Sequence, residues 1–573
     1  MSGKESAAPK FGVVEAKRET GPWSEDIAVG PLSPAALGPA VADLAEHAAA
    51  APDYVADVAQ AAVQQGLRSF ENGWRPSPEK DDHRFVDPAW QVPPFSYFAN
   101  NFLLIEDWLN SAILHTPGVS ERHAKLAAFA ARQWLDAFSP SNLPWTNPEV
   151  LRATVREGGM NFVRGFSHWL EDLHREVDPK AVLAADEFVV GRDVAVTPGK
   201  VVLRNDLIEL IQYAPQTSQT RPEPLLIVPA WIMKYYILDL SPENSLIRWL
   251  VGQGYTVFAI SWRNPGAELR DLSLDDYRTK GVLAALEAVG AVRPAAKVHA
   301  VGYCLGGTLL SIAAAAMARD SDDRLGSLTL FASQTDFTEA GELQLFITEE
   351  QLHFLDDLMA AQGYLDSRQM AGAFQLLRSN DLIWSAMVRG YLLGEREPLI
   401  DLMAWNADTT RMPARMHAEY LRRLFLRNDL AEGRFAVGGH KVSLRDIRVP
   451  VFAVSTATDH VAPWRSVYKI QMLTDADVTF VLSNGGHNAG IVNPPGNPHR
   501  HHQIATHRES EPYIDPDAWQ RSAVEMAGSW WQCWGDWLAR HSGAAAAVPP
   551  SMGAPEHGFA PIADAPGTYV FER

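Results

Sequence analysis

The sequence is poor in several features that mark other classes of protein. Its 573 residues contain only two cysteines, Cys304 and Cys533, which excludes a disulfide-rich scaffold and fits a reducing cytoplasm. No apolar run reaches the roughly 18 residues that a membrane-spanning helix requires, and the polar first residues lack the apolar core of a signal peptide. We therefore expect a cytoplasmic protein without a transmembrane segment.

Positive charge is also scarce. The chain has 50 Lys and Arg residues against 69 Asp and Glu residues, which gives a formal net charge of −19. This balance argues against a general nucleic-acid-binding protein, because such proteins present an excess of positive charge. It still allows a local basic patch that holds an anionic ligand.

The residue pattern changes along the chain, which is long enough for more than one domain. Residues 1–30 lack periodicity and are expected to be disordered. Residues 31–180 show helical spacing, which predicts a helical N-terminal domain. Residues 181–573 alternate between strand and helix patterns, which indicates a mostly parallel sheet covered on both faces.

The alternation is interrupted at about residues 336–445, where helical patterns rich in Met, Phe, Trp and Arg predict a cap inserted over the sheet. Near the end of the chain, Asp515 to His541 is predicted to be one Trp-rich helix. The residues after this helix are expected to be loosely structured.

The most informative motif is residues 302–308, Gly-Tyr-Cys-Leu-Gly-Gly-Thr. An apolar strand-like run precedes it and a small-residue helical run follows it. The pattern G-x-C-x-G at such a junction is typical of the nucleophile elbow of α/β-hydrolases, with Cys304 in place of the usual serine. Gly302 and Gly306 are then required because side chains there would collide with neighbouring backbone. The alternative is a structural cysteine beside a glycine-rich turn.

A thiol nucleophile needs a base, and the base needs an orienting acid. Asp459 follows a predicted strand, and His487 follows the next one. The order Cys304, Asp459, His487 is the nucleophile–acid–base order of the α/β-hydrolase fold. His460 is an alternative participant, although it lies on the loop of the acid and not on that of the base.

The remaining candidate residues have simpler interpretations. His299 precedes the elbow within a strand and is expected in the core, and Cys533 is expected to be packed among tryptophans. A cluster of histidines is expected to be a solvated loop and not a metal site: His499, His501, His502 and His507. We expect no bound metal and no permanently bound cofactor.

Two backbone N–H groups should stabilise the oxyanion of an acyl-transfer reaction. The N–H of Leu305 begins the helix after Cys304 and is the first donor. The second should come from the loop after the first central strand, where we favour Trp231 over Ile232. The side chains of Trp231 and Ile232 are alternatively part of an acyl pocket.

The choice of cysteine also bears on the reaction. A thiolate attacks thioesters readily, and the enzyme thioester that forms is close in energy to the one broken. The acyl group can therefore pass on to an alcohol, whereas a serine ester tends toward hydrolysis. The presence of cysteine at position 304 therefore indicates acyl transfer from a thioester donor, and coenzyme A is the expected carrier of the acyl group.

Several longer motifs resemble the polyhydroxyalkanoate synthases, the polymerases of 3-hydroxyacyl-CoA, over roughly residues 80–573. Besides the elbow they are residues 234–240 (Lys-Tyr-Tyr-Ile-Leu-Asp-Leu), 261–265 (Ser-Trp-Arg-Asn-Pro), 405–408 (Trp-Asn-Ala-Asp), 459–464 (Asp-His-Val-Ala-Pro-Trp) and 486–495 (Gly-His-Asn-Ala-Gly-Ile-Val-Asn-Pro-Pro). The chain length is similar to that of the enzymes of this family that act without a partner subunit.

The resemblance implies a polymerase that releases CoA, with Cys304 as the acyl carrier, His487 as its base and Asp459 as orienting or hydroxyl-activating acid. It also implies a homodimer at the surface of a polyester granule, together with granule-surface proteins. Two alternatives remain: a hydrolase on the same scaffold, either a polyester depolymerase or an acyl-CoA thioesterase, and an inactive granule-binding relative.

Two features of the predicted cap have functional and structural interpretations. Five arginines either bind the phosphates of CoA or form a solvated helix face: Arg411, Arg415, Arg422, Arg423 and Arg427. Apolar residues of the cap are expected to cover an apolar tunnel or a dimer contact: Phe346, Phe354, Met359, Met403 and Trp405. Trp405 is an auxiliary site candidate, because it opens the Trp-Asn-Ala-Asp motif. Beyond these alternatives, the sequence does not predict which residues contact CoA.

Overall fold

The computed structural model of the chain describes residues 34–71, 82–177, 188–366, 369, 383–396 and 398–573. The disorder expected for residues 1–30 concerns a segment outside these ranges. In the described part, no helix is both long and apolar enough to cross a lipid bilayer.

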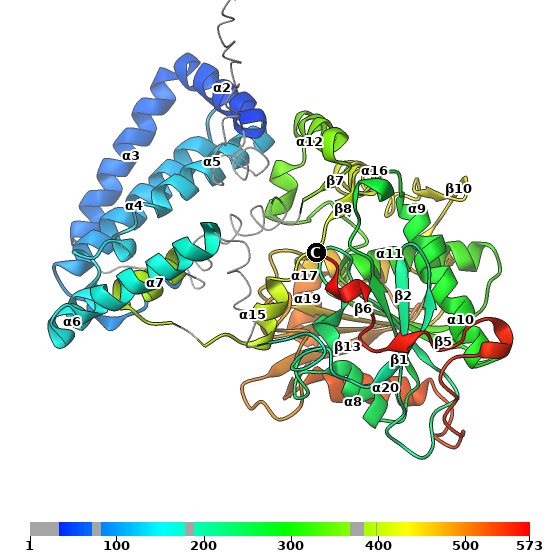
Figure 1. The fold of residues 1–573 in the computed structure, drawn as a ribbon. Helices are drawn as coiled ribbons and strands as arrows, with labels where there is room; N and C mark the ends of the chain where they lie inside the picture. Colours follow the sequence, from blue (N-terminus) through cyan, green and yellow to red (C-terminus); the bar gives the residue numbers. More distant parts are fainter. Residues whose placement is uncertain (1–33, 72–81, 178–187, 367–368, 370–382, 397) are drawn as a thin grey trace, which may run out of the picture.

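The N-terminal part is helical. It comprises α2 (Pro34–Ala50), α3 (Pro52–Glu71), α4 (Phe95–Leu114), α5 (Glu121–Asp136), α6 (Pro148–Glu157) and α7 (Met160–Val177). Local signals delimit α6: the Asn147 side chain accepts hydrogen bonds from two backbone N–H groups of its first turn, and Gly158 ends it at a φ of 60°. Figure 1 shows these helices as a group beside the larger α/β part.

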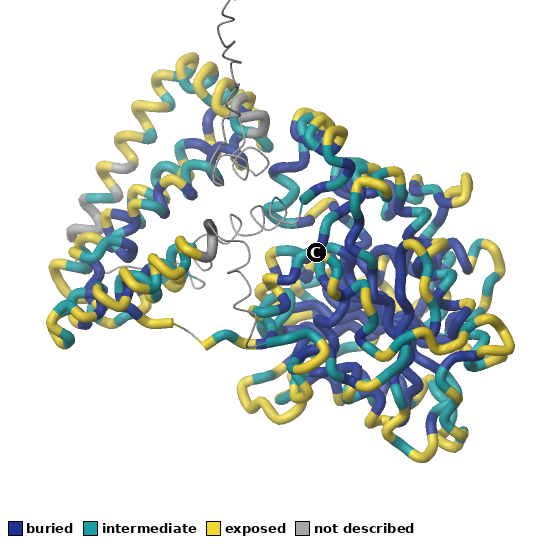
Figure 2. The backbone as a smooth tube through the Cα atoms, in the orientation of Figure 1, coloured by how far each residue is buried: buried dark blue, intermediate teal, exposed yellow. Residues whose placement is uncertain are grey.

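The α/β part is built on an 11-stranded sheet in the order β14-β13-β12-β11-β6-β5-β3-β4-β2-β1-β15. The strands are β1 (Gly199–Arg204), β2 (Ile208–Tyr213), β3 (Leu225–Val228), β4 (Val257–Trp262), β5 (Val298–Tyr303), β6 (Leu325–Phe331), β11 (Val451–Thr456), β12 (Val478–Ser483), β13 (His501–His507), β14 (Val524–Ala527) and β15 (Ala563–Asp564). The strands from β12 to β4 pair in parallel, and the outer strands on both sides are antiparallel. The central strands are fully buried, as the dark blue core of Figure 2 shows.

Helices flank this sheet. They include α8 (Leu246–Gly252), α9 (Leu274–Asp276), a π-helical segment η6 (Tyr277–Leu283), α10 (Ala284–Val292), α11 (Leu305–Arg319), α17 (Trp464–Tyr468), α18 (Ile470–Leu473), α19 (Pro516–Ser522) and α20 (Trp530–Arg540). Buried tryptophans of α20 pack against β6, with the rings of Phe331 and Trp534 5.1 Å apart. A mixed sheet with flanking helices agrees with the predicted α/β architecture.

A cap segment lies between β6 and β11. Its described elements are η7 (Glu342–Phe346), α12 (Glu349–Gln362), β7 (Tyr364–Leu365), α14 (Ser385–Met387), η9 (Val388–Leu393), α15 (Asp401–Asn406), β8 (Met412–Pro413), α16 (Ala414–Tyr420), η10 (Leu421–Leu426), β9 (Ala436–Val437), β10 (His440–Lys441) and η11 (Leu444–Asp446). The N-terminal helices pack against it: the rings of Phe129 and Phe346 are 5.0 Å apart, and Arg132 lies 2.7 Å from Glu342.

The structure corrects the expected single helix between Asp515 and His541. The segment forms α19, the short strand β14 and then α20. The unpaired edge of β13 provides a partner for β14, and Gly528 adopts a φ of 90° that ends the extended run before α20 begins. Pairing at a sheet edge is a tertiary interaction, so it overrides the helical pattern of the tryptophans.

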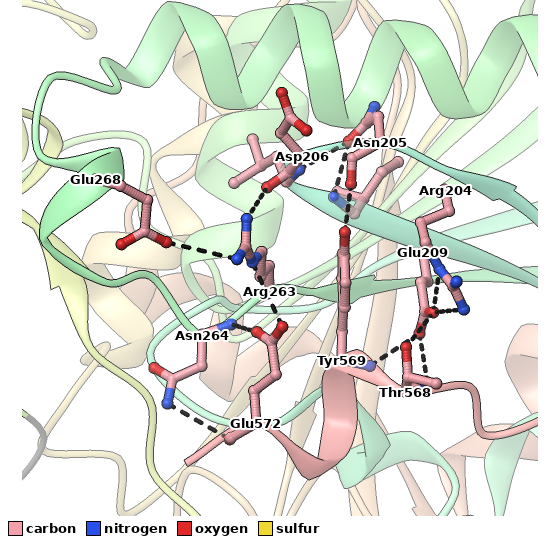
Figure 3. A network of polar contacts seen from close by, with 12 residues as sticks. Arg204, Asn205, Asp206, Glu209, Arg263, Asn264, Glu268, Thr568, Tyr569 and Glu572 are labelled. Atoms are coloured by element: carbon pink, nitrogen blue, oxygen red, sulfur yellow. Dashed lines mark hydrogen bonds and ion pairs between the residues drawn. The ribbon is translucent and has the colours of Figure 1, made fainter.

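The loose structure expected for the end of the chain is also wrong. Strand β15 pairs with β1, and Thr568 and Tyr569 donate hydrogen bonds to Glu209 on β2. Glu572 accepts a hydrogen bond from the N–H of Asn264 and lies 3.4 Å from Arg263 (Figure 3). The last residues are therefore fixed along the strands β2 and β4.

Candidate active site

The loops that carry the candidate residues meet at one edge of the sheet. Cys304 follows β5, Asp459 follows β11 and His487 follows β12, while residues 229–232 follow β3. These four strands run parallel within the sheet, so their carboxyl ends lie on the same side.

Cys304 occupies a strained turn between β5 and α11. Its φ of 52° and ψ of −125° are rare for a residue with a side chain. An added Cβ at Gly302 would lie 2.3 Å from the Cα of Gly307, and one at Gly306 would lie 2.1 Å from the carbonyl oxygen of Val228. The predicted need for glycine at both positions is confirmed, and these close approaches explain how the turn is held.

His487 and Asp459 form a hydrogen-bonded pair beside this turn. Nδ1 of His487 lies 2.8 Å from Oδ2 of Asp459. The other carboxylate oxygen accepts hydrogen bonds of 2.8 Å from the N–H groups of Val461 and Ala462, and Thr456 donates to Oδ2 at 3.1 Å. The Asp459 side chain is fully buried, whereas 14% of the His487 side chain is exposed. Asp459 is thus fixed, and it fixes the ring of His487.

The electrostatic surroundings favour the protonated form of His487. Burial lowers the pKa of its imidazole, but the charges of Asp459 and Cys304 and the hydrogen bonds to both residues raise it, so that the pKa lies well above the usual value of 6.5. The structure therefore brings together the three side chains that the sequence analysis selected. A base with raised proton affinity next to a thiol is the arrangement needed to take the thiol proton.

The backbone around the turn matches the expected oxyanion site in part. Leu305 is the first residue of α11, and the N–H groups of the first helical turn have no acceptor within the helix. In the loop after β3, Thr410 of the cap hydrogen-bonds to the carbonyl oxygens of both Trp231 and Ile232. These bonds fix the loop, while the donor roles of Trp231 and Ile232 stay predictions.

The two side chains of this loop differ in position. Ile232 lines a cavity of about 80 Å³ together with Cys304 and Leu305. The ring of Trp231 instead packs in the core, 5.0 Å from the ring of Tyr277 and 5.9 Å from that of Trp262. Of these two residues, Ile232 therefore has the position of an acyl-pocket residue and Trp231 does not.

Much of the cavity wall comes from the cap. Its apolar residues are Phe337, Leu343, Ile347, Met412, Leu421 and Phe425. None of the five cap residues selected from the sequence lies in this wall. Phe346 packs against Phe129, and Met403 is 40% exposed. The sequence pattern identified the cap but not which helix faces point inward.

Trp405 and His460, the two auxiliary candidates, are not among the residues that line the cavity at Cys304. Trp405 is buried, and its indole N–H donates a 2.8 Å hydrogen bond to the carbonyl oxygen of Lys234. This bond ties the cap to the loop after β3. His460 is exposed, although its neighbours Val461 and Ala462 line the cavity.

The five cap arginines have partners within the chain. Arg411 donates to the backbone oxygen of Arg573 and lies over the ring of Tyr364. The other four lie within 4.0 Å of carboxylates: Arg415 of Glu419, Arg422 of Asp356, Arg423 of Asp429 and Arg427 of Glu349. This pairing favours a solvated, ion-paired surface over a phosphate site.

The histidines of the predicted cluster, His299 and Cys533 are not among the residues that line the cavity. The expected solvated loop is wrong for His501, His502 and His507, which lie in the strand β13, whereas His499 is exposed in a turn before that strand. The ring of buried His502 lies 3.3 Å from Sγ of Cys533, so this thiol has a polar neighbour as well as tryptophans. His299 is buried as expected. Among the described residues, no group of three or more His, Cys, Asp or Glu side chains has a metal-binding arrangement.

The fold and the site define the class of this protein as an α/β-hydrolase-fold protein with cysteine at the nucleophile position. A family described as "alpha/beta hydrolase fold" matches residues 223–494, and one described as "Poly-beta-hydroxybutyrate polymerase (PhaC) N-terminus" matches residues 81–250. The chain belongs to the poly(3-hydroxyalkanoate) polymerase family, as its curated relatives show.

Three relatives establish this membership. The poly(3-hydroxyalkanoate) polymerase of Methylorubrum extorquens is 43% identical over 86% of this chain and 81% of its own length. The polymerase subunit PhaC of Rhizobium etli is 40% identical over 89% and 80%, and that of Cupriavidus necator is 36% identical over 85% and 83%. Among solved structures, a monoacylglycerol lipase of Paleococcus ferrophilus matches 58% of this chain and 99% of its own at 13% identity, with a TM-score of 0.32, which is too weak to bear on function.

Proposed function

We propose that this chain polymerises 3-hydroxyacyl-CoA into a polyester and releases CoA, through a thioester on Cys304. The observation that carries the proposal is the cysteine at the strained turn with His487 and Asp459 beside it, in a member of the poly(3-hydroxyalkanoate) polymerase family. The family defines the reaction, and the three side chains supply the acyl carrier, its base and the orienting acid.

In the first half of the cycle, His487 takes the proton of the Cys304 thiol, and the sulfur attacks the thioester carbonyl carbon of the substrate. The N–H of Leu305 stabilises the oxyanion that forms. The carbon–sulfur bond to CoA then breaks, and the CoA thiolate takes the proton from His487. Asp459 stabilises the positive charge of His487 while the proton is held there.

In the second half, the 3-hydroxyl of another hydroxyacyl-CoA attacks the thioester on Cys304. His487 accepts the hydroxyl proton and returns it to the Cys304 sulfur as that sulfur leaves. One ester bond forms and one thioester bond breaks. The lengthened chain, now attached to CoA, transfers back to Cys304 by the first half of the cycle, so that one CoA is released per added unit.

A cavity with an apolar wall supports transfer to an alcohol over hydrolysis, because it disfavours water near the thioester. The test measures free CoA, polymer and free 3-hydroxy acid in one incubation with (R)-3-hydroxybutyryl-CoA. The proposal predicts CoA release with polymer as the main product. CoA release with only free acid would identify a thioesterase, degradation of added polyester would identify a depolymerase, and absence of all reactions would identify a granule-binding protein.

We further propose, from the resemblance of the motifs and the names of the relatives, a cytoplasmic homodimer at the surface of polymer granules. Light scattering on the purified chain tests the dimer, and fractionation of cells that accumulate polymer tests the location. A monomer at all concentrations, or a chain absent from the granule fraction, would contradict these two proposals separately.

A further inference from the structure

The helix α16 presents one continuous face to the cavity. His417, Tyr420 and Leu421 line the same space as Cys304, and they stand at positions i, i+3 and i+4. Residues with this spacing share one side of a helix. Phe425 continues the face in η10. His417 is therefore a cap residue that the fold directs toward the thiol-bearing edge of the sheet.

His417 is unusual among the buried histidines. It is 3% exposed, and its Nδ1 has no hydrogen-bond partner among the residues that the structure describes. His299 is buried to a similar extent, but its two ring nitrogens lie 2.7 Å from Ser327 Oγ and 2.9 Å from Ser542 Oγ. A buried polar atom without a partner destabilises the fold, and a polar group of a ligand beside the His417 ring would relieve that cost, because His417 lines the cavity.

The imidazole of His417 is suited to a neutral ligand. Burial lowers its pKa to about 4, so that it is uncharged near pH 7. A neutral imidazole has one nitrogen that donates and one that accepts, which suits a hydroxyl group.

Two other polar side chains of the wall are already engaged. The Thr308 hydroxyl donates to the carbonyl oxygen of Gln334, and the Gln334 amide donates to Ser466. Apart from Cys304 and the Tyr420 phenol, the remainder of the wall is apolar. The Tyr420 hydroxyl is therefore the main side-chain group of this wall that competes with His417 for a polar substituent of the acyl group.

We propose that His417 hydrogen-bonds the oxygen on the third carbon of the acyl group as it is transferred to Cys304, and so selects 3-hydroxylated substrates. This inference rests on the proposed function, which provides an acyl thioester whose second polar group is that oxygen. His417 is a specificity-determining residue in this scheme and takes no proton from the substrate.

The experiment measures single-turnover CoA release from (R)-3-hydroxybutyryl-CoA and from butyryl-CoA, which lacks the hydroxyl. The quantity compared is the ratio of the two rates. The wild type should favour the hydroxylated substrate, and His417→Phe should reduce this preference roughly tenfold, the effect of one buried hydrogen bond. His417→Asn places an amide near the position of Nδ1 and should restore part of the preference.

Met416→Leu is the matched control, because Met416 is fully buried beside His417 and is not part of the cavity wall. Its ratio should equal that of the wild type. If His417→Phe does not fold, His417→Leu replaces it. An unchanged ratio in the folded variant, even with both rates lowered equally, would overturn the inference and leave the proposed function standing. Failure of the wild type to release CoA from either substrate would instead contradict the proposed function.

Discussion

Asp459 controls both the position and the charge of His487. Its four hydrogen bonds occupy both carboxylate oxygens, so the side chain cannot rotate away from the ring without losing several of them. The bond to Nδ1 leaves Nε2 of His487 for the thiol. The same carboxylate raises the pKa of His487, which makes this ring a stronger base.

We predict that the two histidines differ in their effect on acylation. His487→Gln should lower the single-turnover release of CoA by at least about a thousandfold, the order of loss seen when one member of a catalytic triad is removed. His460→Gln should lower it less than about threefold, because His460 is exposed. Equal losses in the two folded variants would contradict the assignment of His487 as the base.

A second residue-scale prediction concerns stability at acidic pH. Burial lowers the pKa of His299 to about 4, below the value near 6.5 in an unfolded chain. The unfolded state then binds more protons than the folded state between these pH values. The contribution of His299 to the free energy of unfolding is therefore complete above pH 6.5 and is lost as the pH falls toward 4.

When the pH falls from 7 to 5, the unfolding free energy of His299→Gln should therefore drop by about 2 kcal/mol less than that of the wild type. The size of the pKa difference gives this figure. Urea-unfolding midpoints at the two pH values measure this. Parallel losses in both proteins would show that His299 does not titrate differently in the folded state.

At the scale of elements, the strand–turn–helix unit of β5, Cys304 and α11 depends on close backbone contacts. Gly306→Ala would bring a Cβ to 2.1 Å from the carbonyl oxygen of Val228, which cannot be accommodated without moving β3 or α11. We expect a destabilisation of at least about 2 kcal/mol together with loss of CoA release.

Gly290→Ala is the control for this substitution. Gly290 lies in α10 with no atom within 4 Å of an added Cβ, so alanine should be neutral or stabilise by about 0.5–1 kcal/mol. Thermal unfolding and CoA release measure both variants. A fully active and stable Gly306→Ala protein would contradict the described packing of the turn.

The sequence predicted those features that depend on local patterns. The glycines, Cys304 and the apolar strands form a motif within a few residues, and the order of nucleophile, acid and base is a property of the chain itself. Features that depend on tertiary pairing were missed. The strand β14 exists because the edge of β13 is available, and Phe346 faces Phe129 because of how the cap meets the N-terminal helices. His417 was also missed, because the sequence does not show which face of α16 lines the cavity.

At the scale of the whole molecule, the cap is anchored on several sides. Trp405 binds the loop after β3, Arg573 lies 3.1 Å from Asp408, and Arg132 of the N-terminal helices pairs with Glu342. These contacts hold the apolar wall over Cys304. The exclusion of water from the thioester therefore depends on the cap, the N-terminal helices and the end of the chain, and not on the sheet alone.

Loosening the cap should shift the products from polymer toward free 3-hydroxy acid. Trp405→Phe keeps an aromatic ring but removes the indole N–H that binds Lys234, and it should raise the ratio of free acid to polymer severalfold, since one such bond contributes about 1 kcal/mol. Met403→Ala is the control, because Met403 lies in the same helix α15 and is 40% exposed. A constant ratio with a lower total rate would mean that the cap governs entry of substrate and does not protect the intermediate.

Cys304 should carry the acyl group during the reaction. The most direct measurement is peptide mass spectrometry of the wild type quenched in acid during a single turnover of (R)-3-hydroxybutyryl-CoA. We expect one hydroxyacyl group on the peptide that contains Cys304, sensitive to hydroxylamine and absent from Cys304→Ala. Release of CoA with no acyl group on Cys304 at any time, or an acyl group on Cys533 instead, would contradict it.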